Sequence, residues 1–361
     1  MTTSIIYNLS LPEISSLLEE WGEPAYRARQ IWHGLYHSYW KFPEGFTNLP
    51  SGLRHKLAGS LEYNFPAPIS TLQSSDGETV KTLFQLHDGK AIETVLMKYD
   101  HLLSPLQVDR HATGQGRRTL CVSTQVGCAM GCVFCATGQM GFNRHLSSGE
   151  IVAQVIYYAR LLYAQGEVVT NVVVMGMGEP FHNYHNTMAA IERLNDPDGF
   201  NFGSRRFTIS TVGLIPAIRR FAAAKTQCNL AISLHSADDA LRSSMLPINK
   251  RYPIDELLET SRDYVAATGR RITFEWALVN GVNDTPAQAH LLASKLKGLL
   301  CHVNAIPLNP TMGYSGKATT RNRAYEFQNI LSRSGIPCTI RLRRGLDIKA
   351  GCGQLFGSKK L

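Results

Sequence analysis

The N-terminal third of this 361-residue chain contains no cysteine, although the whole sequence has eight. It also lacks any run of about 20 apolar residues, which a membrane-spanning helix requires, and its start shows no basic segment followed by an apolar one. These absences argue against membrane and secreted proteins, so we expect a cytoplasmic protein with no membrane partner. Lysine and arginine outnumber aspartate and glutamate by 37 to 28, and the net charge of +9 favours a polyanionic partner such as RNA.

Cysteine is confined to the rest of the chain, and this distribution points to metal or redox chemistry. Cys128, Cys132 and Cys135 lie within a single stretch of eight residues. Disulfides are uncommon in the reducing cytoplasm, so a group of this kind indicates a metal centre more than a structural crosslink. Cys228, Cys301 and Cys338 lie far from this stretch in the sequence, and we expect them in the core.

The residue pattern divides the chain into two units and a tail. Residues 1–100 combine helical periodicity with two strand patterns, so we expect a separate N-terminal accessory domain there. Residues 101–345 form the predicted core, and residues 346–361 form a glycine-rich tail that we expect to be mobile. The N-terminal helical patterns are Leu11–Glu20, Tyr26–His37 and Leu53–Leu61, and the strand patterns are Thr79–Leu86 and Ala91–Tyr99.

From residue 119 the chain alternates strand patterns with amphipathic helices. Ser147 and Glu150 have the spacing of a capping box and predict the start of the first of these helices. Such alternation implies a parallel sheet with helices outside it. Six repeats are two short of a closed TIM barrel, so we predict an α/β fold with an incomplete (βα)6 TIM-like barrel. The predicted strands are Thr119–Thr124, Asn171–Gly176, Arg206–Val212, Asn229–His235, Arg271–Leu278 and His302–Pro307.

The three clustered cysteines follow the first predicted barrel strand. Active sites of such barrels collect at the carboxyl ends of the strands, where this loop is expected. An iron–sulfur cube has four irons and usually takes four cysteines, so three protein thiolates leave one iron free for another molecule. The alternative is a zinc site completed by Cys121 or His145, although no second cysteine pair follows at the usual spacing.

The spacing Cys-x3-Cys-x2-Cys after the first strand of a six-unit barrel resembles the radical S-adenosylmethionine (SAM) superfamily. This resemblance implies a [4Fe-4S] cluster on Cys128, Cys132 and Cys135, whose open iron binds the amino and carboxylate groups of SAM. One electron from the cluster then cleaves SAM to a 5′-deoxyadenosyl radical. The segment 176–180, Gly-Met-Gly-Glu-Pro, looks like the superfamily loop in which a glutamate, here Glu179, accepts from the SAM ammonium.

Almost the entire chain is similar to the RlmN/Cfr family of radical RNA methyltransferases. The resemblance also gives the N-terminal domain an RNA-binding role. It assigns the SAM site to Gly178, Glu179, Ser210, Ser233, Leu234, His235 and Asn309. The segments that carry the resemblance are Arg27–Ile31, Thr47–Pro50, Ile92–Val95, Thr119–Ser123, Gly141–Arg144, Ile209–Gly213, Ser233–Ser236, Pro307–Pro310 and Cys352–Leu355.

The resemblance implies a reaction that consumes two SAM molecules per turnover. One methylates Cys352 in the tail, and the radical from the second takes hydrogen from that methyl group, so that the carbon adds to adenine. Glu93 then accepts the proton of the ring carbon, and Cys121 attacks the Cys352 sulfur to release the product through a transient disulfide. Without the resemblance, the ordinary interpretations are a buried inert thiol at Cys121 and a solvated strand residue at Glu93.

The sequence leaves the methylated atom open between two types of family member. RlmN-type members methylate carbon 2 of an adenosine in 23S rRNA and of the tRNA adenosine 3′ to the anticodon, whereas Cfr-type members methylate carbon 8 of the rRNA adenosine. We predict the carbon 2 reaction, with an electron donor such as a flavodoxin-like protein as a further partner.

Two other readings of the sequence are weaker. A methylthiotransferase needs N-terminal cysteines for a second cluster, and this chain has none there. The non-enzyme alternative is a zinc-bearing RNA-binding protein, which the positive charge supports. In either RNA-binding case we expect basic residues near the C-terminus to meet phosphates, among them Arg341, Arg343 and Arg344.

Overall fold

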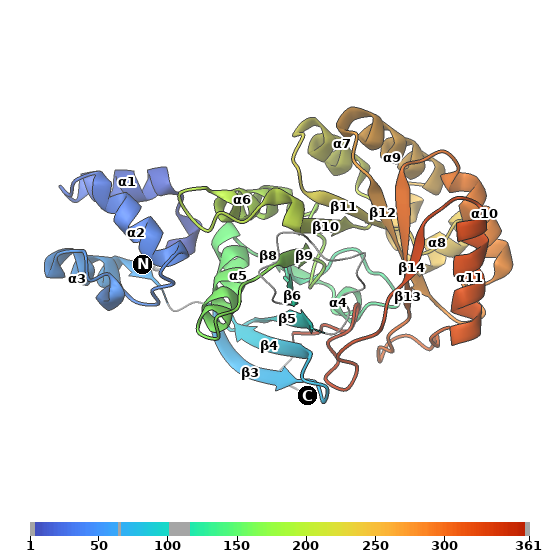
Figure 1. Cartoon of the computed structure of the whole chain (residues 1–361), viewed down its shortest axis with the longest axis horizontal. Coiled ribbons are helices and arrows are strands. Elements are labelled where there is room, and N and C mark those ends of the chain that lie inside the picture. The colour runs from blue at the N-terminus through green and yellow to red at the C-terminus, as the bar shows by residue number, and fades with distance from the viewer. Residues whose placement is uncertain (1–3, 64–65, 101–115, 358–361) are drawn as a thin grey trace.

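The computed structural model describes residues 4–63, 66–100 and 116–357, in which a group of N-terminal helices lies beside one large curved sheet (Figure 1). The first helix begins at a capping box, because the Ser10 hydroxyl accepts from the Glu13 amide while the Glu13 carboxylate accepts from the Ser10 amide. The parallel pair of β1 (Ser4–Ile5) and β2 (Leu61–Glu62) joins the two ends of this unit. Its helices lie close to the predicted bounds and are α1 (Leu11–Glu20), α2 (Tyr26–Tyr36) and α3 (Ser51–Ser60).

Six neighbouring parallel strands form the barrel part of the sheet and confirm the predicted incomplete barrel. Each strand lies beside the next one in the chain, as successive strand–helix repeats produce. A short strand that the sequence analysis missed, β14 (Cys338–Ile340), pairs with the last of them. The six are β6 (Arg117–Cys121), β9 (Asn171–Val174), β10 (Phe207–Thr211), β11 (Asn229–Ser233), β12 (Ile272–Leu278) and β13 (Cys301–Pro307).

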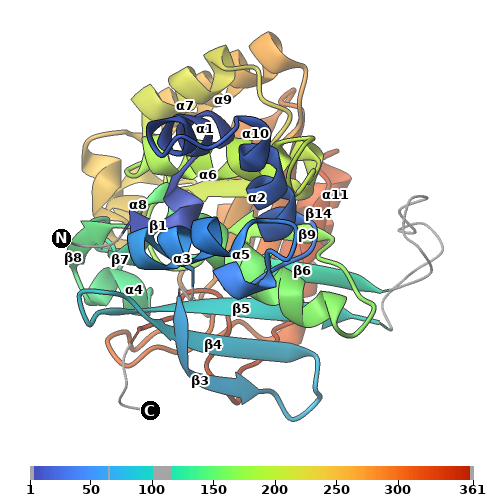
Figure 2. The ribbon, with the colours of Figure 1, turned by 90° about the vertical axis from the view of Figure 1, so that its left-hand side faces the viewer.

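Helices cover the outer face of these strands (Figures 1 and 2). The first of them starts at the predicted capping box of Ser147 and Glu150, and its apolar face is buried. Within the described ranges, no helix combines the length and the apolar composition that crossing a bilayer needs. The covering helices are α5 (Ser148–Tyr163), α6 (Tyr184–Asn195), α7 (Ile215–Ala223), α9 (Ile254–Thr268), α10 (Pro286–Leu296) and α11 (Arg321–Arg333). The short helix α8 (Asp239–Met245) lies at the strand ends, where the Met245 carbonyl accepts from the Val133 amide.

Three antiparallel strands extend the barrel sheet beyond β6. The order continues β6-β5-β4-β3, and Val95 of β5 lies opposite Cys121 of β6. The sheet therefore crosses residue 100, where the sequence analysis placed the end of the N-terminal domain. Turn signals predict a hairpin but not which sheet it joins, and the structure places this hairpin in the core sheet. The three strands are β3 (Ala67–Gln73), β4 (Thr79–Gln85) and β5 (Ala91–Tyr99).

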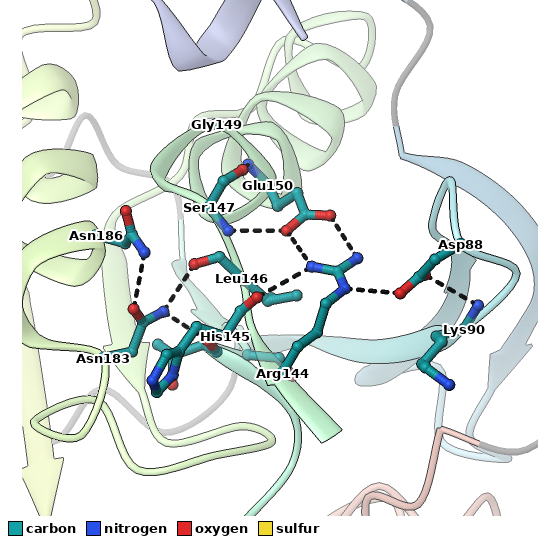
Figure 3. Close-up of polar contacts among 12 residues, drawn as sticks. Asp88, Lys90, Arg144, His145, Leu146, Ser147, Gly149, Glu150, Asn183 and Asn186 are labelled. Carbon is teal, nitrogen blue, oxygen red and sulfur yellow. Dashed lines mark hydrogen bonds and ion pairs between the residues drawn. The ribbon is translucent and has the colours of Figure 1, made fainter. Parts of the chain in front are cut away.

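A network of charged side chains fastens this hairpin to the barrel (Figure 3). Arg144, in β8 (Phe142–His145), pairs with Asp88 in the β4–β5 turn at 2.7 Å and with Glu150 of α5 at 2.8 Å. The Glu150 carboxylate also accepts from the Ser147 amide at 2.8 Å. One carboxylate thus serves both the helix cap and the ion pair, and the segment that follows the clustered cysteines is fixed on two sides.

The described part of the glycine-rich tail, residues 346–357, is docked against the core, whereas its composition predicts a mobile segment. The Gly353 carbonyl accepts from the Ala136 amide at 2.7 Å, and the Leu355 carbonyl accepts from the Thr137 hydroxyl at 2.7 Å. Both donors begin the short helix α4 (Ala136–Gln139), which follows the last clustered cysteine. The positive φ of Gly353, +81°, serves a tight bend within this docked segment.

Candidate active site

Two adjoining cavities open at the carboxyl ends of the barrel strands. The strand-end cavity is lined by the clustered cysteines and by residues that follow strands β9 to β13. The tail cavity lies beside β5, β6 and the tail, and Cys121, Arg341 and Cys352 are among its lining residues. The two share a wall that includes Cys135, Asn309 and Cys352. A thiol of the tail therefore faces both spaces.

One loop presents all three clustered cysteines to the strand-end cavity. The loop begins at Gly127, where φ is +71° and a Cβ atom would lie 1.9 Å from the Gly141 carbonyl oxygen, so only glycine fits. Burial raises the pKa of the Cys128 thiol to about 12 and that of Cys132 well above its usual value. Thiols whose pKa is raised in this way lose their protons readily only beside a positively charged group such as a metal ion.

The geometry of this loop bears on which metal it suits. Across residues 4–63, 66–100 and 116–357, no three histidine, cysteine or carboxylate side chains gather closely enough to hold a single metal ion. The three thiols that line one cavity offer the donor set of an iron–sulfur cube, which leaves one iron open to another molecule.

The loop after β9 places Glu179 in the same cavity. Gly178 has a φ of +103°, and a Cβ atom there would lie 2.5 Å from the Gln125 side chain. The Glu179 carboxylate is buried and accepts from the amides of Phe181 at 3.0 Å and Val212 at 2.9 Å. Burial raises the pKa of Glu179 to about 7. Since the described residues offer this carboxylate no ion pair, a cationic group of a ligand is its natural partner.

The next two strands bring further predicted SAM-site residues to this cavity. The Ser210 and Ser233 hydroxyls, at the ends of β10 and β11, lie 3.4 Å apart. His235 has a φ of +58°, and its Nδ1 accepts from the Ala277 amide at 2.9 Å. Burial lowers the pKa of His235 to about 3, so the ring is neutral and carries its proton on Nε2. Leu234 differs, because its side chain is packed in the core and does not line the cavity.

Asn309, after β13, connects the cavity to the tail. Its amide group donates to the Cys352 carbonyl at 3.0 Å. Its side-chain oxygen is buried without a hydrogen-bond partner. Buried acceptors are normally paired, so this oxygen indicates a donor that a bound ligand supplies.

The tail cavity brings together the two cysteines expected to carry chemistry. Cys121 at the end of β6 and Cys352 in the tail are both free thiols that line it. Burial raises the pKa of Cys121 to about 12, the nearby Cys352 adds to this, and the Arg341 guanidinium opposes it. Cys352 stays open to solvent where the cavities meet, and loss of water on its protein side raises the pKa of its thiol, again against Arg341.

Glu93, the third of the residues expected to carry chemistry, lines neither cavity. Its carboxylate is buried, pairs with the Lys81 ammonium at 2.8 Å and accepts from the Phe356 amide at 2.7 Å. The structure therefore places Glu93 under the tail.

Comparison with known proteins identifies the family. The Radical SAM superfamily model matches residues 122–292, and the model of the ribosomal RNA large subunit methyltransferase N-terminal domain matches residues 6–62. A crystal structure of a radical SAM methyltransferase from Sphaerobacter thermophilus covers 98% of this chain and 100% of its own, with a TM-score of 0.92 and 48% identity.

Two relatives carry more specific names. A probable dual-specificity RNA methyltransferase RlmN of Chloroflexus aurantiacus is 47% identical, over 99% of this chain and 94% of its own length. The dual-specificity RNA methyltransferase RlmN 1 of Myxococcus xanthus is 45% identical, over 98% of this chain and 94% of its own. The chain belongs to the RlmN family of radical SAM methyltransferases. Radical SAM enzymes use a [4Fe-4S] cluster and SAM.

Two polar residues, Glu275 and Arg341, were not assigned to this RlmN-family site from the sequence. Glu275 of β12 lines the strand-end cavity and accepts from the Asn304 amide group at 2.7 Å, and burial raises the pKa of Glu275 to about 7. The available signal was a carboxylate in the middle of an otherwise apolar strand. Arg341 lines the tail cavity beside both thiols. No local pattern distinguished Arg341 from the other C-terminal arginines.

The three arginines expected to meet RNA phosphates occupy different environments. All three line the tail cavity, where Arg344 also pairs with Glu78 and lies over the Tyr99 ring, 4.4 Å from its centroid. Arg343 alone of the three is exposed. The expectation is therefore corrected for Arg344, whose charge is already satisfied within the protein.

Proposed function

We propose that this enzyme methylates carbon 2 of an adenosine in 23S rRNA and of the tRNA adenosine 3′ to the anticodon. The observation that carries the proposal is the position of Cys352, which lines the tail cavity with Cys121 and the strand-end cavity with the clustered cysteines. A carrier thiol needs access to both a methyl donor and a resolving thiol. The carbon 2 assignment follows the RlmN relatives, whose printed names describe dual-specificity RNA methyltransferases.

The strand-end cavity offers a fitting set of groups for the two cofactors. Cys128, Cys132 and Cys135 would hold the cluster, and the cluster when bound supplies the electron that cleaves SAM. Glu179 would accept from the SAM ammonium, and the unpaired oxygen of Asn309 would accept a further donor. The other proposed SAM-site residues are Gly178, Ser210, Ser233, Leu234 and His235, with Leu234 limited to backbone contact.

The remaining steps are assigned to four residues of the chain, Cys352, Glu93, Cys121 and Arg341. The Cys352 sulfur accepts a methyl group and later carries the carbon to adenine. Glu93 accepts the proton that leaves the ring carbon. The Cys121 thiolate attacks the Cys352 sulfur, and the electron pair of the bond from Cys352 to the carbon goes to the carbon, which takes a proton to complete the methyl group. A transient disulfide remains, which an external thiol reduces before the next turnover. Arg341 is the cation placed to stabilise the attacking thiolate.

The proposal also includes the partners of the reaction. The positively charged chain binds rRNA and tRNA, in part through the N-terminal domain. A one-electron donor of the flavodoxin type supplies the cluster with electrons. We place the enzyme in the cytoplasm with its RNA substrates.

The decisive experiment compares RNA from cells with and without this gene. Nuclease digestion and mass spectrometry are expected to show 2-methyladenosine in 23S rRNA and tRNA only when the protein is present. The appearance of 8-methyladenosine instead would establish the Cfr-type reaction. Zinc without sulfide in anaerobically purified protein would contradict the enzyme assignment altogether.

SAM binding is expected to weaken as the pH falls below about 7. Glu179 is a carboxylate above its pKa of about 7 and a neutral acid below it, and only the carboxylate attracts the SAM ammonium. Affinity should therefore fall by up to about tenfold per pH unit on the acid side and level off on the alkaline side. Calorimetric titration from about pH 6 to about pH 8 measures this. A Glu179→Gln variant should bind weakly at every pH, and a flat profile in the native protein would contradict the role.

A further inference from the structure

The hairpin of β4 and β5 contains a buried ion pair between Lys81 and Glu93, and the proposed reaction gives a role to Glu93 but none to Lys81. Lys81 of β4 lies opposite Val95 of β5 in the antiparallel register. Glu93 precedes Val95 by two residues, so its side chain lies on the same face of β5. The Lys81 ammonium and the Glu93 carboxylate are 2.8 Å apart, and each side chain is 5% exposed. Burying two charges is costly unless further hydrogen bonds complete their shells, so their remaining partners are informative.

Those remaining partners belong to the tail, on both sides of Cys352. The Lys81 ammonium donates to the Lys349 carbonyl at 3.2 Å. The second oxygen of Glu93 accepts from the amides of Phe356 at 2.7 Å and Gly357 at 3.3 Å. The pair therefore grips the tail three residues before the carrier thiol and again four and five residues after it.

The second grip depends on a close approach of two backbones. Gly357 has a φ of +61°, and a Cβ atom there would lie 2.7 Å from the Ala91 carbonyl oxygen and 2.9 Å from the Met177 side chain. Only glycine brings its amide this near to β5. The surface of β5 beside Ala91 therefore fits the tail backbone closely at Gly357. This contact is separate from the contacts that Gly353 and Leu355 make with helix α4.

The same carboxylate cannot hold the tail and serve an adenine at once. Both acceptor sites of the Glu93 oxygen that faces the tail are filled by amides, and Glu93 lines neither cavity. With the tail seated, Cys352 faces the strand-end cavity where SAM is proposed to bind. In this arrangement Cys352 can accept a methyl group from SAM, but Glu93 cannot accept the proton of the adenine ring carbon.

We propose that Lys81 is a positioning residue whose pairing with Glu93 clamps the tail for methyl loading, and that RNA binding releases the Phe356 and Gly357 amides so that Glu93 can take the ring proton. This inference rests on the proposed function. After release, Lys81 remains as the cation that orients the freed carboxylate. The Lys81–Glu93 pair thereby places methyl loading of Cys352 before the transfer of the ring proton to Glu93.

The first test measures hydrogen exchange in the native holoenzyme. The amides of Phe356 and Gly357 should be protected in the free protein and exchange at least about tenfold faster when an unmethylated tRNA substrate is bound. The Ala136 amide, which binds the tail at Gly353, provides an internal reference. Unchanged or increased protection of Phe356 and Gly357 on RNA binding would overturn the release step.

The second test uses variants of the cation. Lys81→Met should slow methylation of Cys352 by SAM, in the absence of RNA, by at least about tenfold, whereas Lys81→Arg should restore most of the rate. The readout is the mass of the tail peptide. Lys90→Met is the matched control, because Lys90 lies in the turn of the same hairpin and contacts Asp88 through its backbone amide (Figure 3).

Iron content and thermal unfolding of each variant keep the second test interpretable. A Lys81→Met protein that retains its cluster and methylates Cys352 at the native rate would overturn the clamp, as would a loss that Lys81→Arg does not rescue. If the native protein never methylates Cys352, the proposed function fails. The exchange experiment still reports separately on the grip of Glu93 on the tail.

Discussion

Replacing Cys121 with alanine is expected to trap RNA on the protein as a covalent adduct. Methyl loading of Cys352, hydrogen abstraction and addition to adenine do not use Cys121, so they should proceed. Release should then stop, because no other thiol is placed to attack the Cys352 sulfur: among the described residues, Cys121, Cys135 and Cys352 are the cysteines that line the tail cavity, and Cys135 is proposed to hold the cluster. Turnover should end after one RNA per protein.

Denaturing gels with labelled RNA measure this accumulation directly. Cys352→Ala should give neither adduct nor methylated RNA, because no carrier atom remains, while its iron content stays native. The double variant should behave like Cys352→Ala, since the adduct requires the carrier first. Native turnover by Cys121→Ala, or an adduct that survives in Cys352→Ala, would contradict the assigned roles.

Loss of any one clustered cysteine is expected to abolish activity together with the iron. A cube left with two protein thiolates is poorly held, so Cys128→Ala, Cys132→Ala and Cys135→Ala should each fall far below the roughly four irons per chain of the native protein. Iron and sulfide analysis of anaerobically purified protein measures this loss. Activity should disappear in proportion.

The matched control for these variants is Cys228→Ala. Cys228 is fully buried and lies outside both cavities, so its replacement should affect stability and not iron content. A full cluster in any of the three clustered-cysteine variants would show that another group ligates the iron. Cys121 would then be a candidate, because it is nearest in sequence to Cys128 among the cysteines outside the cluster.

Local patterns predicted the barrel, because strand and helix periodicity depends on neighbouring residues, and the capping box of Ser147 and Glu150 predicted a helix start to the residue. The family resemblance assigned Ser210, Ser233 and Asn309 to the SAM site. Since the carboxyl ends of parallel strands meet at one edge of the sheet, these residues could be expected to share one cavity. The packing of Leu234 into the core was the exception that periodicity did not reveal.

Contacts between distant segments could not be predicted in this way. The hairpin signals gave β4 and β5 but not their pairing with β6, which depends on Val95 meeting Cys121 across the intervening segment. The ion pair of Lys81 and Glu93 and the docking of the tail have no sequence signature of their own. Glycine in the tail indicated freedom of the backbone, whereas the structure uses that freedom to fit the tail against β5.

The docked tail also sets the order in which this protein can become functional during its synthesis. Glu93 precedes the Phe356 amide by 263 positions, and the Ser75 amide precedes its partner Asp347 by 272. Domains generally fold as the chain emerges, and contacts of such long sequence separation form late. A nascent chain can thus complete its barrel while Glu93 is still uncovered, and a product truncated before residue 346 would have the barrel without the carrier. We expect seating of the tail to be the final folding event, at which the protein becomes ready for the first methyl transfer.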